Sequence, residues 1–247
     1  MPAKLRVDLA LVANGLADSR SEAQSLIKAG YVLLDMEPVQ KASQVVAINA
    51  PLFVKAKEHP WVSRGGMKLA HALDVFDVSL KDKVILDLGA STGGFSDVAL
   101  QKGAAKVFAV DVGQGQLAEK IQKDPRVISL EKINARILDE TLVPDPIDIL
   151  VCDVSFISLK LALPAGLTLV KEGGEAIVLI KPQFEVGKGR VGKGGIVKDP
   201  ALHEEVCLSI HQWFDALEGW CVKDITTSPI TGPDGNVEFL LYAKRSV

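Results

Sequence analysis

Two patterns of apolar and polar positions divide the chain. In the first, apolar residues at helical spacing over residues 6–14 predict a helix that ends at Gly15. The sequence Ser19-Arg20-Ser21-Glu22 is a capping box that predicts a second helix, reaching Ala29. Strands are expected over residues 31–34 and 45–54, with a turn over residues 35–38 between them. Residues 1–58 are therefore expected to form a small α+β domain.

The second pattern follows a charged stretch that ends at Pro60 and predicts a linker, which we place at residues 59–64. Beyond it a helix is expected over residues 67–76, and short apolar runs rich in β-branched residues then alternate with helical stretches. These runs, the expected parallel strands, are residues 84–88, 107–110, 147–152 and 176–180. A short turn joins two last strands, residues 220–225 and 237–243, which implies an antiparallel pair at the sheet edge. Residues 65–247 are therefore expected to form a Rossmann-like α/β domain with an antiparallel last strand.

Composition narrows the function classes. The 247 residues are 48% hydrophobic, which suffices for a core, and the net charge of −3 differs from that of a uniformly basic nucleic-acid binder. An aromatic content of 5% gives little material for a base-stacking platform. The three cysteines form no CxxC pair, which argues against a disulfide framework or a zinc cluster and favours a reducing compartment. With neither a signal-peptide pattern nor an apolar run of about 18 residues, we expect a cytoplasmic protein that does not enter a membrane.

A glycine-rich turn follows the first strand of the larger domain. Residues 84–94, Val-Ile-Leu-Asp-Leu-Gly-Ala-Ser-Thr-Gly-Gly, lead from a buried strand through a turn into a helix expected over residues 95–102. Asp111 ends the second strand about 20 residues later, where a carboxylate can bind ribose hydroxyls. Ser91 stands where the pyrophosphate of a dinucleotide needs glycine, and Asp87 suits a cationic sulfonium and amino group better than a dianion. The turn therefore favours S-adenosylmethionine over NAD as the cofactor.

The same turn permits a second hypothesis, a serine hydrolase. Residues 89–93 match the G-x-S-x-G nucleophile elbow, with Ser91 as the nucleophile. The only histidines after it, His203 and His211, fall on a helix expected over residues 200–216 rather than in a loop after a late strand. This hypothesis also leaves Asp111 without a use, so cofactor binding is preferred.

Charged residues follow the next two buried strands. Asp153 comes just past residues 147–152, where open α/β sheets place ligand-contacting residues, although it could also be a helix N-cap. Lys181 ends the following strand, where a lysine is costly unless it is paired or functional, although it could also extend into solvent. Desolvation there disfavours the charged ammonium, as a general base requires.

A basic, glycine-rich loop begins at Lys181. Residues 181–198 contain five basic residues and one acidic residue, Glu185. Such a loop suits an RNA phosphate backbone better than a small neutral substrate, the alternative being a disordered surface loop. The net charge of the whole chain therefore says little about its partner, because basic residues are concentrated beside the expected site.

Taken together, these stretches resemble the TlyA family, whose members carry the name hemolysin and are also described as ribosomal-RNA 2′-O-ribose methyltransferases. The resemblance covers nearly the whole chain. Residues 1–58 are similar to the alpha-L type RNA-binding domain of ribosomal proteins, through Arg6-Val-Asp8, Ser19-Arg20 and the helix that ends at Gly30. The remainder is similar to the FtsJ-type methyltransferase domain, with a class I methyltransferase sheet. The stretches that carry this second resemblance are residues 63–69, 87–95, 153–158 and 181–185.

The resemblance implies a catalytic set of Lys68, Asp153, Lys181 and Glu238, although local sequence alone would place Lys68 on a helix surface and Glu238 at a strand edge. If the last strand is antiparallel, Glu238 begins it at the edge where the parallel strands end. The implied reaction is in-line transfer of a methyl group from S-adenosylmethionine to a ribose 2′-hydroxyl, without a metal. Lys181 is the expected general base and Asp153 is expected to orient it.

Two further sets of residues are predicted. The cofactor site is expected to comprise Asp87, Gly89, Ala90, Ser91, Gly93, Gly94, Phe95, Asp111, Val112, Asn134 and Asp153. RNA contacts are expected from Arg6, Ser19, Arg20, Lys28, Arg64, Lys188, Arg190 and Lys193. The expected partner is ribosomal RNA or a ribosomal subunit. A third hypothesis is a cytolysin, but the sequence shows neither the export signal nor the membrane-spanning stretch that we would expect of one.

Overall fold

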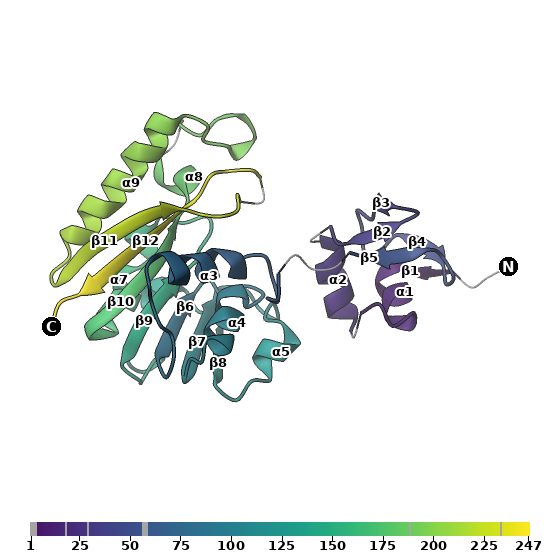
Figure 1. Cartoon of the computed structure of the whole chain (residues 1–247), viewed down its shortest axis with the longest axis horizontal. Helices are drawn as coiled ribbons and strands as arrows, with labels where there is room; N and C mark the ends of the chain where they lie inside the picture. The colour runs from purple at the N-terminus through teal and green to yellow at the C-terminus, as the bar shows by residue number, and fades with distance from the viewer. Residues whose placement is uncertain (1–3, 18, 29, 56–58, 188, 233) are drawn as a thin grey trace. The chain divides into compact units, whose positions relative to one another are not determined.

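The computed structural model describes residues 4–17, 19–28, 30–55, 59–187, 189–232 and 234–247 (Figure 1). The chain separates into two compact units, Met1–Pro60 and Trp61–Val247. We describe each unit by itself.

The first unit packs two helices against short strands. In chain order its elements are β1 (Lys4–Arg6), α1 (Val7–Ala13), α2 (Arg20–Lys28), β2 (Val32–Leu34), β3 (Glu37–Pro38), β4 (Val45–Ala47) and β5 (Leu52–Val54). The strand expected over residues 45–54 is in fact two strands, because β4 pairs with β1 whereas β5 pairs with β2. A turn closed by the Ala50 amide on the Ala47 carbonyl separates them, and Pro51 has no N–H to continue a ladder. Apolar residues of α1, α2 and β2 form the core of this unit.

The turn between β2 and β3 is tighter than expected. Asp35 and Met36 are its two central residues, with φ angles of 49° and 67°. Two successive positive φ angles are typical of a type I′ turn, whose twist matches that of the flanking strands. The ladder consequently resumes at Glu37, which pairs with Leu34, and the turn does not extend to residue 38.

A buried carboxylate joins the two helices of this unit. The Asp8 side chain is fully buried and accepts hydrogen bonds from Arg6 Nε and Nη2 at 2.9 Å, Arg20 Nε at 3.0 Å and Gln24 Nε2 at 2.9 Å. Because a buried charge is costly unless it is paired, both guanidinium groups are needed to keep Asp8 ionised inside the unit. They also hold the pKa of Asp8 well below its usual range.

The second unit is built on a seven-stranded sheet. Its strands are β6 (Val84–Leu88), β7 (Lys106–Asp111), β8 (Val127–Glu131), β9 (Ile147–Cys152), β10 (Val170–Ile180), β11 (Trp220–Thr227) and β12 (Phe239–Arg245). They lie side by side in the order β11-β12-β10-β9-β6-β7-β8 (Figure 1). The pairs from β10 to β8 are parallel, while β12 is antiparallel to both β10 and β11. The predicted α/β fold with an antiparallel last strand is confirmed.

The antiparallel pair expected at the edge of the sheet is confirmed: it is β11 and β12, with β11 outermost and β12 between β11 and β10. The strand at the opposite edge, β8, differs from the expectation, because it is not among the strands that the sequence predicts. Its sequence, Val-Ile-Ser-Leu-Glu, lacks the continuous apolar run of a buried strand, and two of its five residues are exposed.

Helices cover both faces of this sheet. On one face, residues of α3 (Gly66–Val75), α4 (Gly94–Gln101) and α5 (Glu119–Gln122) pack with Ile85, Ile149 and Ile177. On the other, residues of α6 (Leu159–Ala162), α7 (Pro164–Thr168) and α9 (Pro200–Asp215) pack with Leu86 and Leu150. The remaining short elements are α8 (Pro182–Glu185), η1 (Ala135–Ile137) and η2 (Lys193–Gly195). Within the described residues, no helix has the length and apolar character needed to cross a bilayer.

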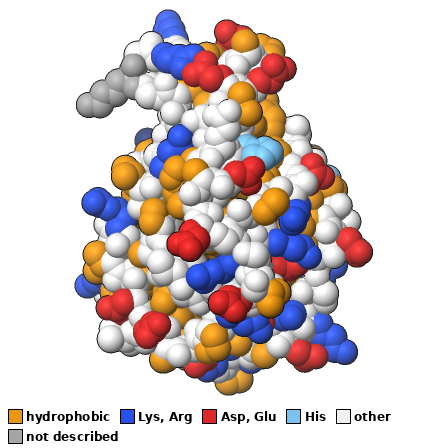
Figure 2. Space-filling model, turned by 90° about the vertical axis from the view of Figure 1, so that its left-hand side faces the viewer, with side chains coloured by type: hydrophobic (Ala, Val, Ile, Leu, Met, Phe, Trp, Pro, Cys, Tyr) orange, Lys and Arg blue, Asp and Glu red, His pale blue; other side chains and the backbone are white. Residues whose placement is uncertain are grey.

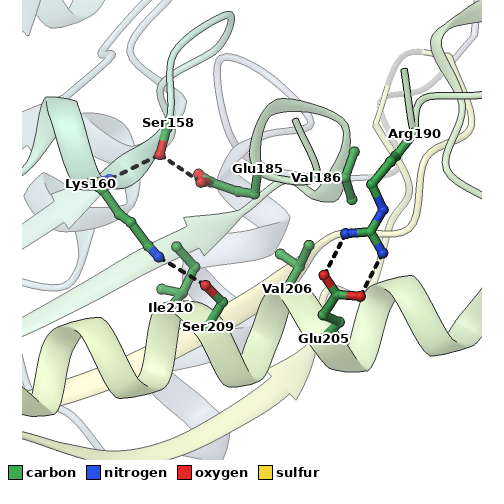
Figure 3. Close-up of a pocket in the computed structure, with 9 residues that line it drawn as sticks. All are labelled: Ser158, Lys160, Glu185, Val186, Arg190, Glu205, Val206, Ser209 and Ile210. Atoms are coloured by element: carbon green, nitrogen blue, oxygen red, sulfur yellow. Dashed lines mark hydrogen bonds and ion pairs between the residues drawn. The ribbon is translucent and has the colours of Figure 1, made fainter. Parts of the chain in front are cut away.

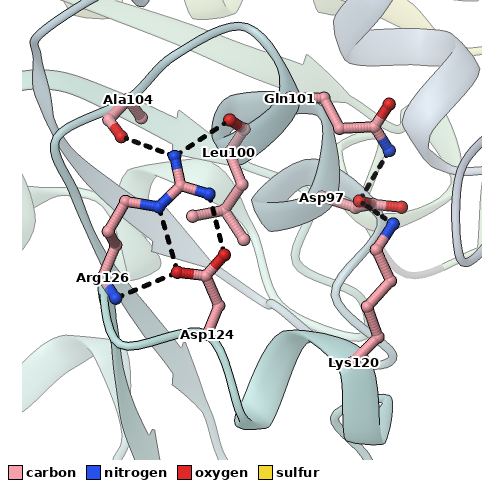
Figure 4. A network of polar contacts seen from close by, with 7 residues as sticks. All are labelled: Asp97, Leu100, Gln101, Ala104, Lys120, Asp124 and Arg126. Carbon is pink, nitrogen blue, oxygen red and sulfur yellow. Dashed lines mark hydrogen bonds and ion pairs between the residues drawn. The ribbon is translucent and has the colours of Figure 1, made fainter.

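Polar contacts of Asp97 and Arg126 connect α4 with α5 and with the residues that precede β8 (Figure 4). Asp97, which is 1% exposed, accepts hydrogen bonds from Val62 N and Gln101 Nε2 at 2.8 Å and from Lys120 Nζ at 3.0 Å. Arg126 donates from Nη1 to the carbonyls of residues 100 and 104 at 3.2 and 3.3 Å. These carbonyls lie at and beyond the end of α4, and the first of them also accepts from the Gly103 amide at 3.2 Å. The segment that enters the unit is thereby fixed against the helix that follows the glycine-rich turn.

We predict that Asp8→Ala destabilises the first unit by about 2 kcal/mol, because the variant loses several charge-assisted hydrogen bonds. Amide exchange in α2 should then quicken by roughly 30-fold, as hydrogen–deuterium exchange of the full chain would measure. The Asp8 contribution is complete above its unfolded pKa of about 3.9 and is lost as pH falls below it. The two proteins should therefore converge in acid.

Asp35→Asn is the matched control, because it removes an exposed carboxylate from a left-handed position that Asn tolerates. Equal exchange in Asp8→Ala and wild type at neutral pH would contradict the prediction.

Candidate active site

Four charged side chains meet at the carboxyl edge of the parallel strands. Lys68 comes from α3, Asp153 follows β9, Lys181 follows β10 and Glu238 directly precedes β12. Lys181 Nζ lies 2.6 Å from Asp153 Oδ1, and Lys68 Nζ lies 3.4 Å from Asp153 Oδ2 and 2.6 Å from Glu238 Oε2. The structure therefore brings together all four residues of the expected catalytic set, in the alternating order Glu238–Lys68–Asp153–Lys181.

Three of these side chains are buried, and the fourth, Asp153, is partly buried, with 19% of its side chain exposed. Lys68 is 6% exposed, Lys181 7% and Glu238 1%. Two positive and two negative charges balance, as buried ionic groups require. Neither structural alternative holds: Lys181 does not reach solvent, and the N-cap of α6 is Ser158 rather than Asp153.

Lys68 and Glu238 could not have been selected from local sequence. The inward face of α3 lies against the sheet and carries Lys68 with it, although its neighbours in sequence are typical of an ordinary amphipathic helix. Glu238 is buried because its strand enters the sheet between two others, and a Cβ added at Gly232 would lie 2.7 Å from its Oε1. The packing of α3 and the order of the strands explain these two positions, which only the family resemblance indicates in the sequence.

The glycine-rich turn lies directly beside this charged set. Gly89 and Gly93 have φ angles of +81° and +91°, which glycine adopts without strain. A Cβ at Gly89 would stand 2.8 Å from the Asp153 carbonyl oxygen, so the close approach of these two segments depends on glycine. Ser91 also has a positive φ, 49°, and is exposed, whereas Ala90 is 6% exposed.

Asp87 supplies an unsatisfied acceptor at this edge. The residue is fully buried, and Ser96 Oγ donates to its Oδ2 at 2.6 Å. Its Oδ1 has no hydrogen-bond partner among the described residues. Burial, together with the charges of Asp153 and Asp111, raises the pKa of Asp87 to about 7. A buried carboxylate with a vacant acceptor fits a positively charged ligand such as S-adenosylmethionine. Ser96, which donates to this carboxylate, is not among the expected site residues, because one serine on a helix gives no sequence signal.

Asp111 has a second task besides the expected one. Its two carboxylate oxygens accept from Ser91 N at 2.8 Å and Gly113 N at 2.7 Å, so the side chain holds the glycine-rich turn in place. Each oxygen retains a further lone pair for a ligand hydroxyl. Val112 is exposed beside it, and Asn134 N-caps η1.

Two expected cofactor positions face inward. The Phe95 side chain is 4% exposed and packs in the core with Leu69 and Val98. Gly94 is buried against the segment that enters the unit, since a Cβ there would stand 2.3 Å from Ser63 Oγ. Only backbone atoms of these two residues are placed to contribute to the turn.

The serine hydrolase hypothesis lacks its base. The nearest polar partner of Ser91 Oγ is Gln116 Oε1 at 3.5 Å, and an amide cannot accept a proton at neutral pH. His203 Nε2 is engaged with the Val197 carbonyl at 2.8 Å, and His211 Nε2 lies 3.1 Å from Asp215 Oδ2. Neither histidine is available to Ser91.

The expected RNA contacts fall into two groups. Lys28, Arg64 and Lys193 are exposed, whereas Lys188 lies outside the described residues. The others have structural partners: Arg6 and Arg20 pair with Asp8, Ser19 Oγ accepts from the Glu22 amide at 3.1 Å, and Arg190 forms a bidentate pair with Glu205 at 2.5 and 2.6 Å (Figure 3). On the face drawn in Figure 2, basic and acidic side chains are interspersed and do not form a patch of one sign. Among the described residues, no group of three His, Cys, Asp or Glu is placed to hold a metal ion.

The sheet order, the glycine-rich turn after β6 and the acidic residue that ends β7 define a class I methyltransferase fold. The profile of the FtsJ-like methyltransferases matches residues 61–245, and that of the S4 domain matches residues 5–50. The chain therefore belongs to the FtsJ-like methyltransferase family and carries an S4 domain at its N-terminal side.

Relatives match nearly the whole chain. The 16S/23S rRNA (cytidine-2′-O)-methyltransferase TlyA of Mycobacterium tuberculosis is 44% identical over 245 residues, 99% of this chain and 91% of the relative. Hemolysin A of Brachyspira hyodysenteriae is 38% identical over 240 residues, 96% and 99% of the two chains. A solved structure described as a hemolysin candidate of Streptococcus thermophilus has a TM-score of 0.77 at 40% identity and covers 100% of this chain and 90% of its own. The predicted resemblance is confirmed, and the family favours the methyltransferase over the hydrolase.

We predict that Asp87→Asn stabilises the ligand-free protein increasingly as pH rises from about 4 to about 7. Folded Asp87 keeps its proton until about pH 7, whereas the unfolded chain releases it near pH 4, so wild-type stability falls over this range. Asn has no such cost and still accepts from Ser96 Oγ. The difference in free energy of unfolding between the variant and wild type should reach at most about 4 kcal/mol near pH 7 and stay constant above it. Thermal unfolding at several pH values would measure it.

The exposed Asp77, whose φ of 52° Asn tolerates, supplies the control Asp77→Asn. A difference in stability between wild type and Asp87→Asn that does not change with pH across this range would contradict the prediction.

Proposed function

We propose that this protein transfers a methyl group from S-adenosylmethionine to a ribose 2′-hydroxyl of ribosomal RNA. The observation that carries the proposal is the buried row Glu238–Lys68–Asp153–Lys181 beside the glycine-rich turn. The name of the relative TlyA, an rRNA (cytidine-2′-O)-methyltransferase, supports the substrate class, and the S4 domain supports RNA as the partner.

The cofactor is proposed to bind at the glycine-rich turn. When bound, S-adenosylmethionine supplies an electrophilic methyl group on a positively charged sulfur. Asp87 offers its vacant Oδ1 to a cationic group, and Asp111 offers lone pairs to hydroxyl groups. Gly89 keeps side-chain atoms away from the Asp153 carbonyl, so that the turn and the charged row remain adjacent.

Lys181 is the proposed general base. A ribose hydroxyl is a poor nucleophile at neutral pH, so its proton would be accepted as the new O–C bond forms and the S–C bond to the methyl group breaks, which would leave the sulfur as a neutral thioether. In the proposed step, Lys181 first releases its own proton to water, and its Nζ, then a neutral amine, accepts the proton of the hydroxyl. Asp153 Oδ1 at 2.6 Å and Ser155 Oγ at 2.8 Å fix the direction of Nζ. Ser155 was not among the expected site residues, although it lies within the stretch 153–158 that carries the resemblance.

The other charges of the row are proposed to position the ribose. Lys68 bridges Asp153 and Glu238. Asp153 thus pairs with a different lysine through each of its two carboxylate oxygens. Glu238, at 1% exposure, balances the charge of Lys68 and holds its Nζ. Because these four side chains supply the base and the positioning groups, the proposal includes no metal. The expected substrate is rRNA, free or within a ribosomal subunit, in the cytoplasm.

We predict that Lys181→Ala and Lys181→Arg lower the rate of methyl transfer by roughly 10²- to 10⁴-fold, the usual contribution of a general base. The arginine variant keeps the positive charge but cannot accept a proton, so it separates a base from a positioning cation. S-adenosylmethionine affinity, measured by titration calorimetry, should change by less than about threefold. Mass spectrometry of rRNA nucleosides after incubation with labelled cofactor measures the product.

The exposed Lys102, whose ion pair among the described residues is with the exposed Asp74 at 3.8 Å, supplies the control Lys102→Ala. Full methyl transfer by Lys181→Ala would overturn the assignment of the base. A product methylated on the base of the nucleotide would overturn the ribose as the acceptor.

We also predict that Arg64→Ala and Lys193→Ala weaken binding of an rRNA fragment and make it less sensitive to salt. Each lost phosphate contact should reduce the slope of log Kobs against log salt by about 0.7 to 0.9. Lys171→Ala is the control, because Lys171 is engaged by Asp148 at 2.6 Å near the opposite end of the strands. Slopes equal to wild type in both variants would exclude these residues from the RNA contact.

A further inference from the structure

One carboxylate that the proposed function does not use lines a cavity of about 120 Å³ (Figure 3). The residue is Glu185, the last residue of α8 and half-buried. The cavity lies among α6, α8 and α9, and Figure 3 shows the Glu185 carboxylate directed toward Ser158. Its position is informative because α8 begins directly after Lys181.

Glu185 holds the segment that follows Asp153. Its Oε2 accepts a hydrogen bond from Ser158 Oγ at 2.7 Å, and its Oε1 accepts from the Leu159 amide at 2.8 Å. That amide is at the start of α6, where no helical carbonyl can receive it. The carboxylate therefore joins the two segments that leave β9 and β10, namely residues 153–159 and 181–185.

The two segments meet at three levels. At the sheet, Lys181 Nζ donates to Ser155 Oγ at 2.8 Å and pairs with Asp153. In the middle, the rings of Phe156 and Phe184 lie 5.2 Å apart between centroids. At the far end, the Glu185 carboxylate accepts hydrogen bonds from residues 158 and 159. We call residues 153–159 and 181–185 together the clasp.

The first segment of the clasp needs an external restraint. Phe156 has a φ of 65°, a left-handed conformation that is costly for an aromatic residue, and its side chain is 90% exposed. Such a conformation persists only where surrounding contacts enforce it. The Phe156 side chain has little burial to contribute, so the hydrogen bonds on either side of it carry the restraint.

We infer that Glu185 is a positioning residue, which closes the clasp and so keeps Lys181 Nζ against Asp153 in the geometry needed for methyl transfer. The inference rests on the proposed function, because it acts through the proposed base. It depends on the reach of the side chain rather than on its charge, since two hydrogen bonds close the clasp. A misplacement of about 1 Å in a reacting group can cost on the order of 10²-fold in rate.

The test compares two variants that separate reach from charge. Glu185→Gln keeps the length: its amide oxygen accepts from the Leu159 amide, and its amide nitrogen donates to Ser158 Oγ. Glu185→Asp keeps the charge but is one methylene shorter, so it cannot make both bonds. We expect kcat to stay within about threefold of wild type for Gln and to fall by about 10- to 100-fold for Asp. The KM for S-adenosylmethionine should change by less than about threefold in both.

Glu204→Ala, an exposed carboxylate on α9, is the matched control. Gln as impaired as Asp would show that the charge is needed and would overturn the inference, as would an Asp variant with wild-type kcat. Thermal unfolding is measured alongside, and kcat is compared below the transition of each variant.

Hydrogen–deuterium exchange of residues 153–160 keeps the test separate from the proposed function. The Leu159 amide should exchange faster in Glu185→Asp than in Glu185→Gln, and equal exchange would overturn the clasp. If wild type methylates no rRNA, the proposed function fails, while this measurement still decides whether Glu185 closes the clasp.

Discussion

The burial of two lysines and two carboxylates in one alternating row constrains most of the second unit. Each of these charges would be costly to remove from water alone, and each is tolerated because the next one lies within 3.4 Å. The row requires a helix residue, the ends of two parallel strands and the start of an antiparallel strand at one edge of the sheet. The insertion of β12 between β10 and β11 satisfies this requirement by bringing Glu238 to the edge where β9 and β10 end.

The cofactor turn depends on the same edge. Gly89 approaches the Asp153 carbonyl so closely that a side chain would separate the turn from the charged row. Asp87 is on β6, next to β9, and has a vacant acceptor at Oδ1. The negative charge of Asp153 is one of the causes that raise the pKa of Asp87. Asp153 therefore couples the two groups electrostatically, because its charge raises the pKa of Asp87 while its Oδ1 pairs with Lys181.

The loops beyond the sheet complete this arrangement by mutual contact. The segments after β9 and β10 contain few buried apolar side chains, so hydrogen bonds from Lys181 and Glu185 hold them together. The residues predicted to contact RNA differ in whether their side chains already have a partner within the protein. Arg190 is engaged by Glu205 and Ser19 by its own helix, while Lys193 and Arg64 are free of such partners among the contacts of the described residues. A count of basic residues in the sequence therefore overstates the charge available to RNA.

The apolar pattern and the residue types at the strand ends are enough to predict the architecture and five residues of the expected site. Strands such as β6 and β9 are predicted with the bounds that the structure shows, because they are apolar except for one aspartate each and are buried on both faces over most of their length. Gly89, Gly93, Asp111, Asp153 and Lys181 stand out because their residue types are unusual at the ends of buried strands. The edge strand β8 escaped notice because an exposed edge does not impose an apolar pattern. The places of Lys68, Glu238, Ser96 and Glu185 were decided only by tertiary structure: each is an ordinary residue in its local sequence, and its role arises from a partner 9 to 170 positions away.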